Sequence, residues 1–183
     1  MKKIQKNEGF TLIELLIVVA IIGIIAAIAV PGLLRARMSG NEASAIGSLR
    51  AINTAQQNYS QFCNAYGTQL PSLNFSPGGG ANTQPYLSPD MTSGVTVMKS
   101  GYSTTMAAGA NNVVIDAAAG LGVGCPAASG TAYYATALPG AGGASFGSTG
   151  TRSFATNQAG TIWQNATNAA PTEPFGAPAT PIQ

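Results

Sequence analysis

Histidine is absent from this chain of 183 residues, and charged residues make up only 8% of it. Because Ser-His and Cys-His catalytic pairs need an imidazole as the general base, the composition excludes both. Lys99 is the only lysine beyond residue 9, so a Ser-Lys pair has a single candidate. No calcium-binding loop pattern is formed by the scattered carboxylates Asp90, Asp116 and Glu173. The sequence therefore predicts no enzyme, no metal site and no bound cofactor.

Net positive charge is confined to the first nine residues of the chain. Lys2, Lys3 and Lys6 stand there against Glu8, and this local excess equals the formal net charge of +2. The remaining residues carry five basic and five acidic side chains, which cancel. Because a nucleic-acid-binding surface needs clustered cations, direct nucleic-acid binding is not predicted.

A long apolar segment follows this basic tip. Residues 10–34 form a run of 25 residues in which Glu14 is the only charged one. As a helix they would measure about 37 Å, enough to cross the roughly 30 Å hydrocarbon core of a bilayer. A secretory signal is cleaved after its apolar region. Here the basic leader ends at Gly9, before the apolar region, so a cut after Gly9 would keep the membrane helix in the mature protein.

Glu14 lies among large aliphatic side chains near the start of this segment. A carboxylate in lipid costs about 2.5–3.5 kcal/mol, and less near the interface, so such groups usually have a partner. Cleavage after Gly9 would create one, because the new amine of Phe10 in a neighbouring subunit is cationic. The alternative is a carboxylate close to the bilayer surface that simply reaches the water.

The sequence GFTLIE, from Gly9 to Glu14, leads into an apolar run that ends at Pro31. This pattern resembles the N-terminal motif of type IV pilins and type II secretion pseudopilins. The resemblance implies that a prepilin peptidase cuts after Gly9 and methylates Phe10, and that Glu14 sets the register between subunits. Pro31, followed by Gly32, matches the helix-interrupting proline of that family. By the residues alone, a tolerated kink in a membrane helix explains this pair as well.

The chain divides into a leader at 1–9, a hydrophobic helix at 10–34, an amphipathic half-helix at 35–62 and a β-rich head at 63–183. In the amphipathic half, apolar side chains recur at helical spacing and predict a stripe that covers a sheet: Ala45, Ile46, Leu49, Ile52, Tyr59, Phe62. Polar side chains interleave with them and are expected on the opposite face: Arg50, Asn53, Gln57, Asn58.

The head contains short segments rich in Thr, Tyr, Val and Phe, and glycine-rich stretches separate them: 95–98, 101–106, 112–116, 131–137, 152–156, 161–164. The last two segments are predicted to form a hairpin, and a proline-rich tail at 169–183 is predicted to lie on the surface or to be mobile. We expect an α+β fold in which the long helix packs on a small antiparallel sheet of about four strands. The strand series resembles the pseudopilin-G group, which implies a pilin fold.

Cysteine occurs only twice, as Cys63 and Cys125. An even number in an exported chain favours one disulfide, which would pin the end of the long helix to the sheet. The alternative is a pair of buried free thiols.

By its resemblance, the chain is expected to be a structural subunit of a type IV pilus. It would wait in the inner membrane as a single-pass protein with its head in the periplasm. Pilus or secretion machinery would then assemble it into an extracellular homopolymer. A major pseudopilin of a type II secretion system is the alternative within the family. A single-pass membrane protein with a periplasmic ligand-binding domain is the alternative of another class, and it would not be processed at Gly9.

Overall fold

The computed structural model describes residues 9–74, 84–116, 120 and 124–182. Apart from Gly9, the predicted leader lies outside these described residues. The chain forms two compact units, Met1–Arg37 and Met38–Gln183, and each is treated by itself. The long helix α1 (Leu12–Cys63) contributes to both units.

In the first unit, α1 consists mainly of apolar turns. Every described side chain from residue 9 to residue 37 is exposed. The mean hydropathy of an 18-residue window of α1 reaches 3.1, so the helix is long and apolar enough to span a membrane. The α-helical conformation continues through Pro31 and Gly32.

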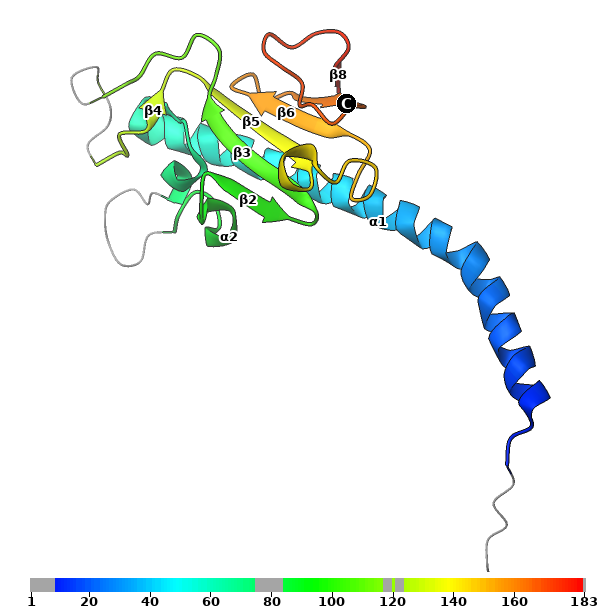
Figure 1. The fold of residues 1–183 in the computed structure, drawn as a ribbon. Coiled ribbons are helices and arrows are strands. Elements are labelled where there is room, and N and C mark those ends of the chain that lie inside the picture. The colour runs from blue at the N-terminus through cyan, green and yellow to red at the C-terminus, as the bar shows by residue number, and fades with distance from the viewer. Residues whose placement is uncertain (1–8, 75–83, 117–119, 121–123, 183) are drawn as a thin grey trace, which may run out of the picture. The chain divides into compact units, whose positions relative to one another are not determined.

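In the second unit, the rest of α1 packs against one face of an antiparallel sheet (Figure 1). The sheet has six strands in the order β2-β3-β5-β6-β7-β8, and each strand is antiparallel to its neighbours. The strands are β2 (Thr96–Lys99), β3 (Tyr102–Ala108), β5 (Tyr133–Pro139), β6 (Ser153–Asn157), β7 (Ile162–Asn165) and β8 (Thr180–Pro181). The predicted α+β architecture is confirmed, with six strands in place of about four.

Smaller elements complete the head. A two-stranded sheet pairs β1 (Tyr66–Gly67) with β4 (Ser129–Gly130). The short helices are η1 (Leu70–Asn74), α2 (Pro89–Thr92) and η2 (Ala141–Gly143).

Five of the six predicted strand segments lie in the main sheet, as β2, β3, β5, β6 and β7. The hairpin of β6 and β7 also forms as predicted, and Gly160 in its turn has a φ of 76°, which favours glycine. The prediction of a strand at 112–116 is wrong, because only Val114 forms a bridge, to Gly130. The partner strand β4 is two residues long and cannot extend the ladder. The tail, by contrast, supplies the unexpected edge strand β8, which pairs with β7.

The hydrophobic core lies between α1 and the inner face of the sheet. Along β5, Tyr133, Ala135 and Ala137 are buried toward the helix, while Tyr134 and Thr136 lie on the other face and are partly buried. This is the alternation expected of a strand with one covered face. The helix contributes a matching stripe of buried side chains: Ala45, Leu49, Ile52, Ala55, Tyr59, Cys63.

Two predictions for the helix faces are wrong. Phe62 was expected in the buried stripe, but it is 45% exposed. One residue advances a helix by 100°, so Phe62 turns away when the next residue, Cys63, points into the core. Asn53 was expected on the polar face, but it is only 8% exposed, because its amide finds hydrogen-bond partners on the sheet.

A disulfide joins Cys63, the last residue of α1, to Cys125 in the segment before β4. The two Cα atoms lie 5.9 Å apart, and 62 positions separate the residues in the sequence. The predicted bridge is therefore confirmed. By chain entropy, closing a loop of this length stabilises the fold by about 4 kcal/mol.

Candidate functional site

The helix α1 begins with a reciprocal cap between Thr11 and Glu14. The Thr11 backbone N–H donates to Glu14 Oε2 over 2.9 Å, and the Thr11 hydroxyl donates to the same oxygen over 2.6 Å. In return, the Glu14 backbone N–H donates to Thr11 Oγ1 over 3.3 Å. This is a capping box, in which each residue satisfies a backbone N–H of the other. Glu14 is thereby held against the positive end of the helix dipole.

Gly9 and Phe10 precede this cap and lie outside α1. Phe10 is 90% exposed, and a Cβ atom placed on Gly9 would meet nothing within 4 Å. The peptide bond between these two residues is therefore accessible, in a segment whose side chains are exposed. The cap needs the backbone N–H of Thr11, which a cut after Gly9 would leave in place.

Beyond the cap, α1 presents an apolar surface on all sides. Its large exposed side chains between residues 12 and 34 include Leu12, Ile13, Leu15, Leu16, Ile17, Val18, Val19, Ile21, Ile22, Ile24, Ile25, Ile28, Val30, Leu33 and Leu34. A contiguous exposed surface of this kind marks contact with a membrane or with other protein. Glu14 is its one charged side chain.

Pro31 and Gly32 lie within this surface, and the α-helix continues through them. Pro31 lacks the backbone N–H that would bond to the preceding turn. Loosening of the helix at Pro31 and Gly32 during assembly stays a prediction.

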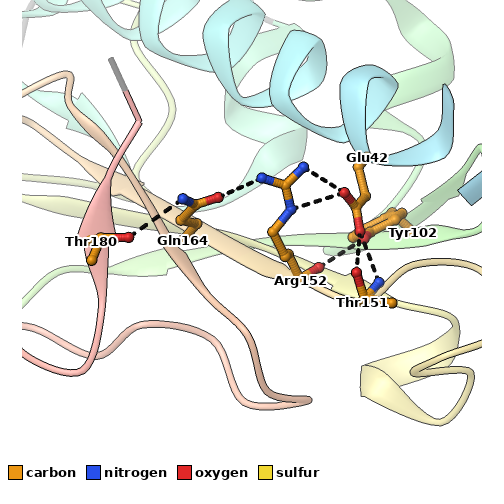
Figure 2. Close-up of polar contacts among 6 residues, drawn as sticks. All are labelled: Glu42, Tyr102, Thr151, Arg152, Gln164 and Thr180. Atoms are coloured by element: carbon orange, nitrogen blue, oxygen red, sulfur yellow. Dashed lines mark hydrogen bonds and ion pairs between the residues drawn. The ribbon is translucent and has the colours of Figure 1, made fainter. Parts of the chain in front are cut away.

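A second polar site joins α1 to the head through Glu42, which is only 5% exposed (Figure 2). Its Oε1 accepts hydrogen bonds from the backbone N–H of Thr151 (2.8 Å) and from the Thr151 hydroxyl (3.0 Å). Its Oε2 accepts from Arg152 Nε (2.9 Å) and Nη2 (2.6 Å), which is a two-pronged charge-assisted contact. Glu42 is thus fully engaged by the residues that lead into β6.

These contacts extend across the sheet, as Figure 2 shows. Arg152 Nη1 donates to Gln164 Oε1 on β7 over 2.8 Å, and Gln164 Nε2 reaches Thr180 Oγ1 on β8 at 3.4 Å. The Tyr102 hydroxyl donates to the Arg152 carbonyl over 2.7 Å. The network therefore connects Glu42 of α1 to β3, β7 and β8 and to the residue before β6.

Burial by itself raises the pKa of the Glu42 carboxyl. The hydrogen bonds from Thr151 and Arg152 outweigh burial, so that the pKa lies below its ordinary value. Glu42 is consequently ionised at neutral pH and forms a true ion pair with Arg152, at 2.6 Å.

Sequence reasoning missed the role of Glu42, although a signal was present. The apolar stripe of the amphipathic half begins at Ala45, and one step of three residues backward reaches Glu42. A carboxylate at a stripe position predicts a buried acid with a partner. The partner, Arg152, lies 110 residues further along the chain, and no local pattern identifies it.

A match to a known family concerns this N-terminal region. Residues 4–30 match the family described as the prokaryotic N-terminal methylation motif. Over 72 residues the chain is 42% identical to the type IV major pilin protein PilA of Myxococcus xanthus, which covers 39% of this chain and 33% of that protein. It is 42% identical over 69 residues to the type IV wide pilus major component PilA4 of Thermus thermophilus, covering 38% and 53%.

A third relative belongs to a secretion system. The chain is 39% identical over 59 residues to the type II secretion system core protein G of Vibrio cholerae, covering 32% of this chain and 40% of that protein. The chain thus spans about a third to a half of the length of these curated relatives. No solved structure shows a significant match to the chain.

The fold and the site define a class of protein with one exposed apolar helix, capped by a carboxylate, and a β-rich head packed on the second half of that helix. The methylation motif and these relatives make the chain similar to type IV pilins and type II secretion pseudopilins, over the matched part of its length.

Proposed function

We propose that this chain is a structural subunit that polymerises into a type IV pilus filament. One observation carries the proposal. An apolar helix, exposed on every side and bearing a single carboxylate at its capped start, follows a basic leader that ends at Gly9. A protein that kept this helix after processing would have to bury it in lipid or against other copies of itself.

Processing and assembly are linked by charge in this proposal. A prepilin peptidase cuts after Gly9, which removes the lysine-rich leader and frees the amine of Phe10, and the same enzyme methylates that amine. The cationic amine of one subunit then pairs with Glu14 of its neighbour and sets the register. The pair offsets the cost of holding a carboxylate among apolar helices.

The location of the subunit changes during this process. Before assembly the apolar half of α1 holds the subunit in the inner membrane, with the head in the periplasm. After assembly the same residues lie in the core of an extracellular filament. Separate pilus or secretion machinery drives the transfer, and the head of each subunit faces outward.

Mass spectrometry of the protein purified from its own cells tests this proposal most directly. We expect a mature chain that begins at Phe10 and carries one added methyl group. A chain that still begins at Met1, or that is cut elsewhere, would contradict the proposal. It would instead favour a single-pass membrane protein whose periplasmic head binds a ligand.

A major pseudopilin of a type II secretion system is the second candidate. The identity with the core protein G of Vibrio cholerae supports it. Processing at Gly9 is common to both candidates, so filament length separates them. Electron microscopy at native expression should show long surface fibres for a pilin, and no surface fibres for a pseudopilin.

A further inference from the structure

Among the charged side chains beyond Gly9, those on α1 include more cations than carboxylates. All ten of them lie in the described residues, and those residues contain two ion pairs. Lys99 Nζ contacts Asp90 Oδ2 at 2.7 Å, and Arg152 contacts Glu42. The three remaining cations are exposed on α1, and within the described part of the chain none of them contacts a carboxylate: Arg35, Arg37, Arg50.

Filament assembly would change the surroundings of Arg35 and Arg37 more than those of Arg50. Arg35 and Arg37 directly follow the apolar surface, which ends at Leu34. Burying that surface among other helices would bring both guanidinium groups next to a region of low dielectric, where an unpaired charge is costly. Arg50 lies on the exposed flank of turns that already pack on their own sheet, so it can stay in water.

Glu173 is a carboxylate suited to receive such an arginine. Its Oε2 accepts from the backbone N–H of Ala110 over 2.6 Å, and its Oε1 accepts from Asn157 Nδ2 over 2.6 Å. Both donors are neutral, so they hold the carboxylate in place without balancing its charge. Glu173 is half-buried, and one side of it remains open to solvent.

Aromatic rings lie near Glu173 on the outer face of the sheet, which is the face turned away from α1. Tyr134 and Trp163 point away from the core, because their neighbours Tyr133 and Ile162 point into it. The ring of Phe175 stacks on Trp163 at 5.5 Å and lies 6.2 Å from Tyr134, measured between centroids. Burial, with a smaller contribution from the charge of Glu173, raises the pKa of Tyr134 to about 12.

A fixed carboxylate beside aromatic rings is chemistry that suits arginine. The guanidinium group can pair with the carboxylate while its flat face lies against a ring, which an ammonium group does less well. The unpaired cations of α1 are all arginines.

We propose that Glu173 of one subunit pairs with the Arg35–Arg37 segment of a neighbouring copy in the filament. This inference rests on the proposed function and adds a second electrostatic contact to it, between the outer face of the head and the end of the apolar helix.

Charge reversal and charge exchange in the full-length chain, expressed in its own cells, test the contact. We expect Glu173→Arg to lower the yield of sheared filaments at least about tenfold, since like charges placed together cost several kcal/mol. Arg35→Glu or Arg37→Glu should lower it similarly. Combining Glu173→Arg with either Arg35→Glu or Arg37→Glu should restore most of the filament yield in one of the two double variants. The substitution that restores the yield identifies the arginine that pairs with Glu173.

A photo-cross-linking amino acid at Thr172, which is exposed beside Glu173, gives an independent readout. We expect cross-linked dimers whose second peptide contains Arg35 and Arg37. Cross-links confined to other peptides would overturn the inference. Normal assembly of Glu173→Arg would also overturn it. So would a result in which Asp116→Arg, and not Glu173→Arg, lowers the filament yield, and Arg35→Glu or Arg37→Glu restores it.

Three controls keep the result interpretable. Arg50→Glu should assemble normally, because Arg50 needs no partner. Every variant should keep an oxidised Cys63–Cys125 bridge and wild-type amounts in the membrane, which shows that the head has folded. If the wild-type chain is neither cut after Gly9 nor assembled, the proposed function fails; if it is cut and assembled and Glu173→Arg assembles equally well, only this inference fails.

Discussion

The hydroxyl of Tyr133 on β5 donates a 2.9 Å hydrogen bond to Asn53 Oδ1 on α1, and both side chains are buried between helix and sheet. The amide of Asn53 donates in turn to Thr156 Oγ1 over 3.1 Å and to the Gly160 carbonyl over 2.9 Å. One polar residue of the helix thus engages β5, β6 and the turn after β6. Because these partners are fixed in place, the contact sets the position of the sheet along the helix.

Replacing Asn53 by alanine should destabilise the head by about 1–3 kcal/mol, because buried groups of Tyr133 and Gly160 lose their partner. Chemical denaturation of the full-length chain in detergent measures this, with fluorescence from Trp163, the single tryptophan. Asn58→Ala is the matched control, since Asn58 is exposed on the same helix. Equal midpoints for the two variants would contradict the role of Asn53.

The ion pair of Glu42 and Arg152 should make the stability of the head depend on pH. The folded pKa of Glu42 lies below its unfolded value, so the unfolded chain binds more protons as the solution is acidified. The stabilisation is therefore complete above the ordinary glutamate pKa of about 4.3 and is lost as the pH falls through the folded pKa.

Glu42→Gln removes this contribution, because the amide has a similar size but carries no charge, and its nitrogen cannot accept the hydrogen bonds that one carboxylate oxygen accepts. We expect wild type to exceed Glu42→Gln in unfolding free energy at pH 7, and the difference to shrink toward pH 3. Denaturation curves of both proteins at several pH values give the comparison. A difference that stays constant over this range would show that the charge of Glu42 contributes nothing.

The bridge between Cys63 and Cys125 anchors the end of α1. Reduction should lower the unfolding free energy by about 2–4 kcal/mol, because the unfolded chain regains the freedom that the closed loop removes. Denaturation with and without reductant measures the loss. The Cys63→Ser/Cys125→Ser double variant should start at the lower stability and show no response to reductant.

Much of this architecture was readable from the sequence, because it is encoded locally. The apolar run, the helical stripe and the alternation of the longer strands each depend on neighbouring residues. The segment 112–116 was misread because it has the composition of a strand, while its two-residue partner β4 cannot pair with all of it. The tail strand β8 was missed because its pairing depends on β7 and not on its own composition.

The polar contacts between helix and sheet were not predictable in this way. Asn53 has the composition of a solvent-facing position, and its burial depends on partners 103 and 107 residues away. Glu42 likewise depends on Arg152, which no spacing connects to it. At the N-terminus, by contrast, the Thr11–Glu14 cap was encoded locally as a threonine three residues before a glutamate. Sequence reasoning considered the charge of Glu14, including its place in the first turn of the helix, and missed its hydrogen bonds with Thr11.

That double role of Glu14 gives the sharpest test of the assembly site. Glutamine also serves at the third position of a capping box, so Glu14→Gln keeps the helix start and removes the charge. Thr11→Val removes the capping hydroxyl at a cost of about 1 kcal/mol and keeps the charge. If Glu14 sets register with a neighbour's Phe10 amine, Glu14→Gln and Glu14→Ala should both reach the membrane at normal levels and form few filaments. Thr11→Val should assemble in near wild-type amounts.

Immunoblots of membrane and sheared fractions, with electron microscopy of the sheared material, measure both steps. The reverse pattern, in which Glu14→Gln assembles and Thr11→Val does not, would mean that Glu14 acts by starting its own helix. The carboxylate would then have no need of a neighbour, and cleavage after Gly9 would matter for removing the leader and not for creating a cation.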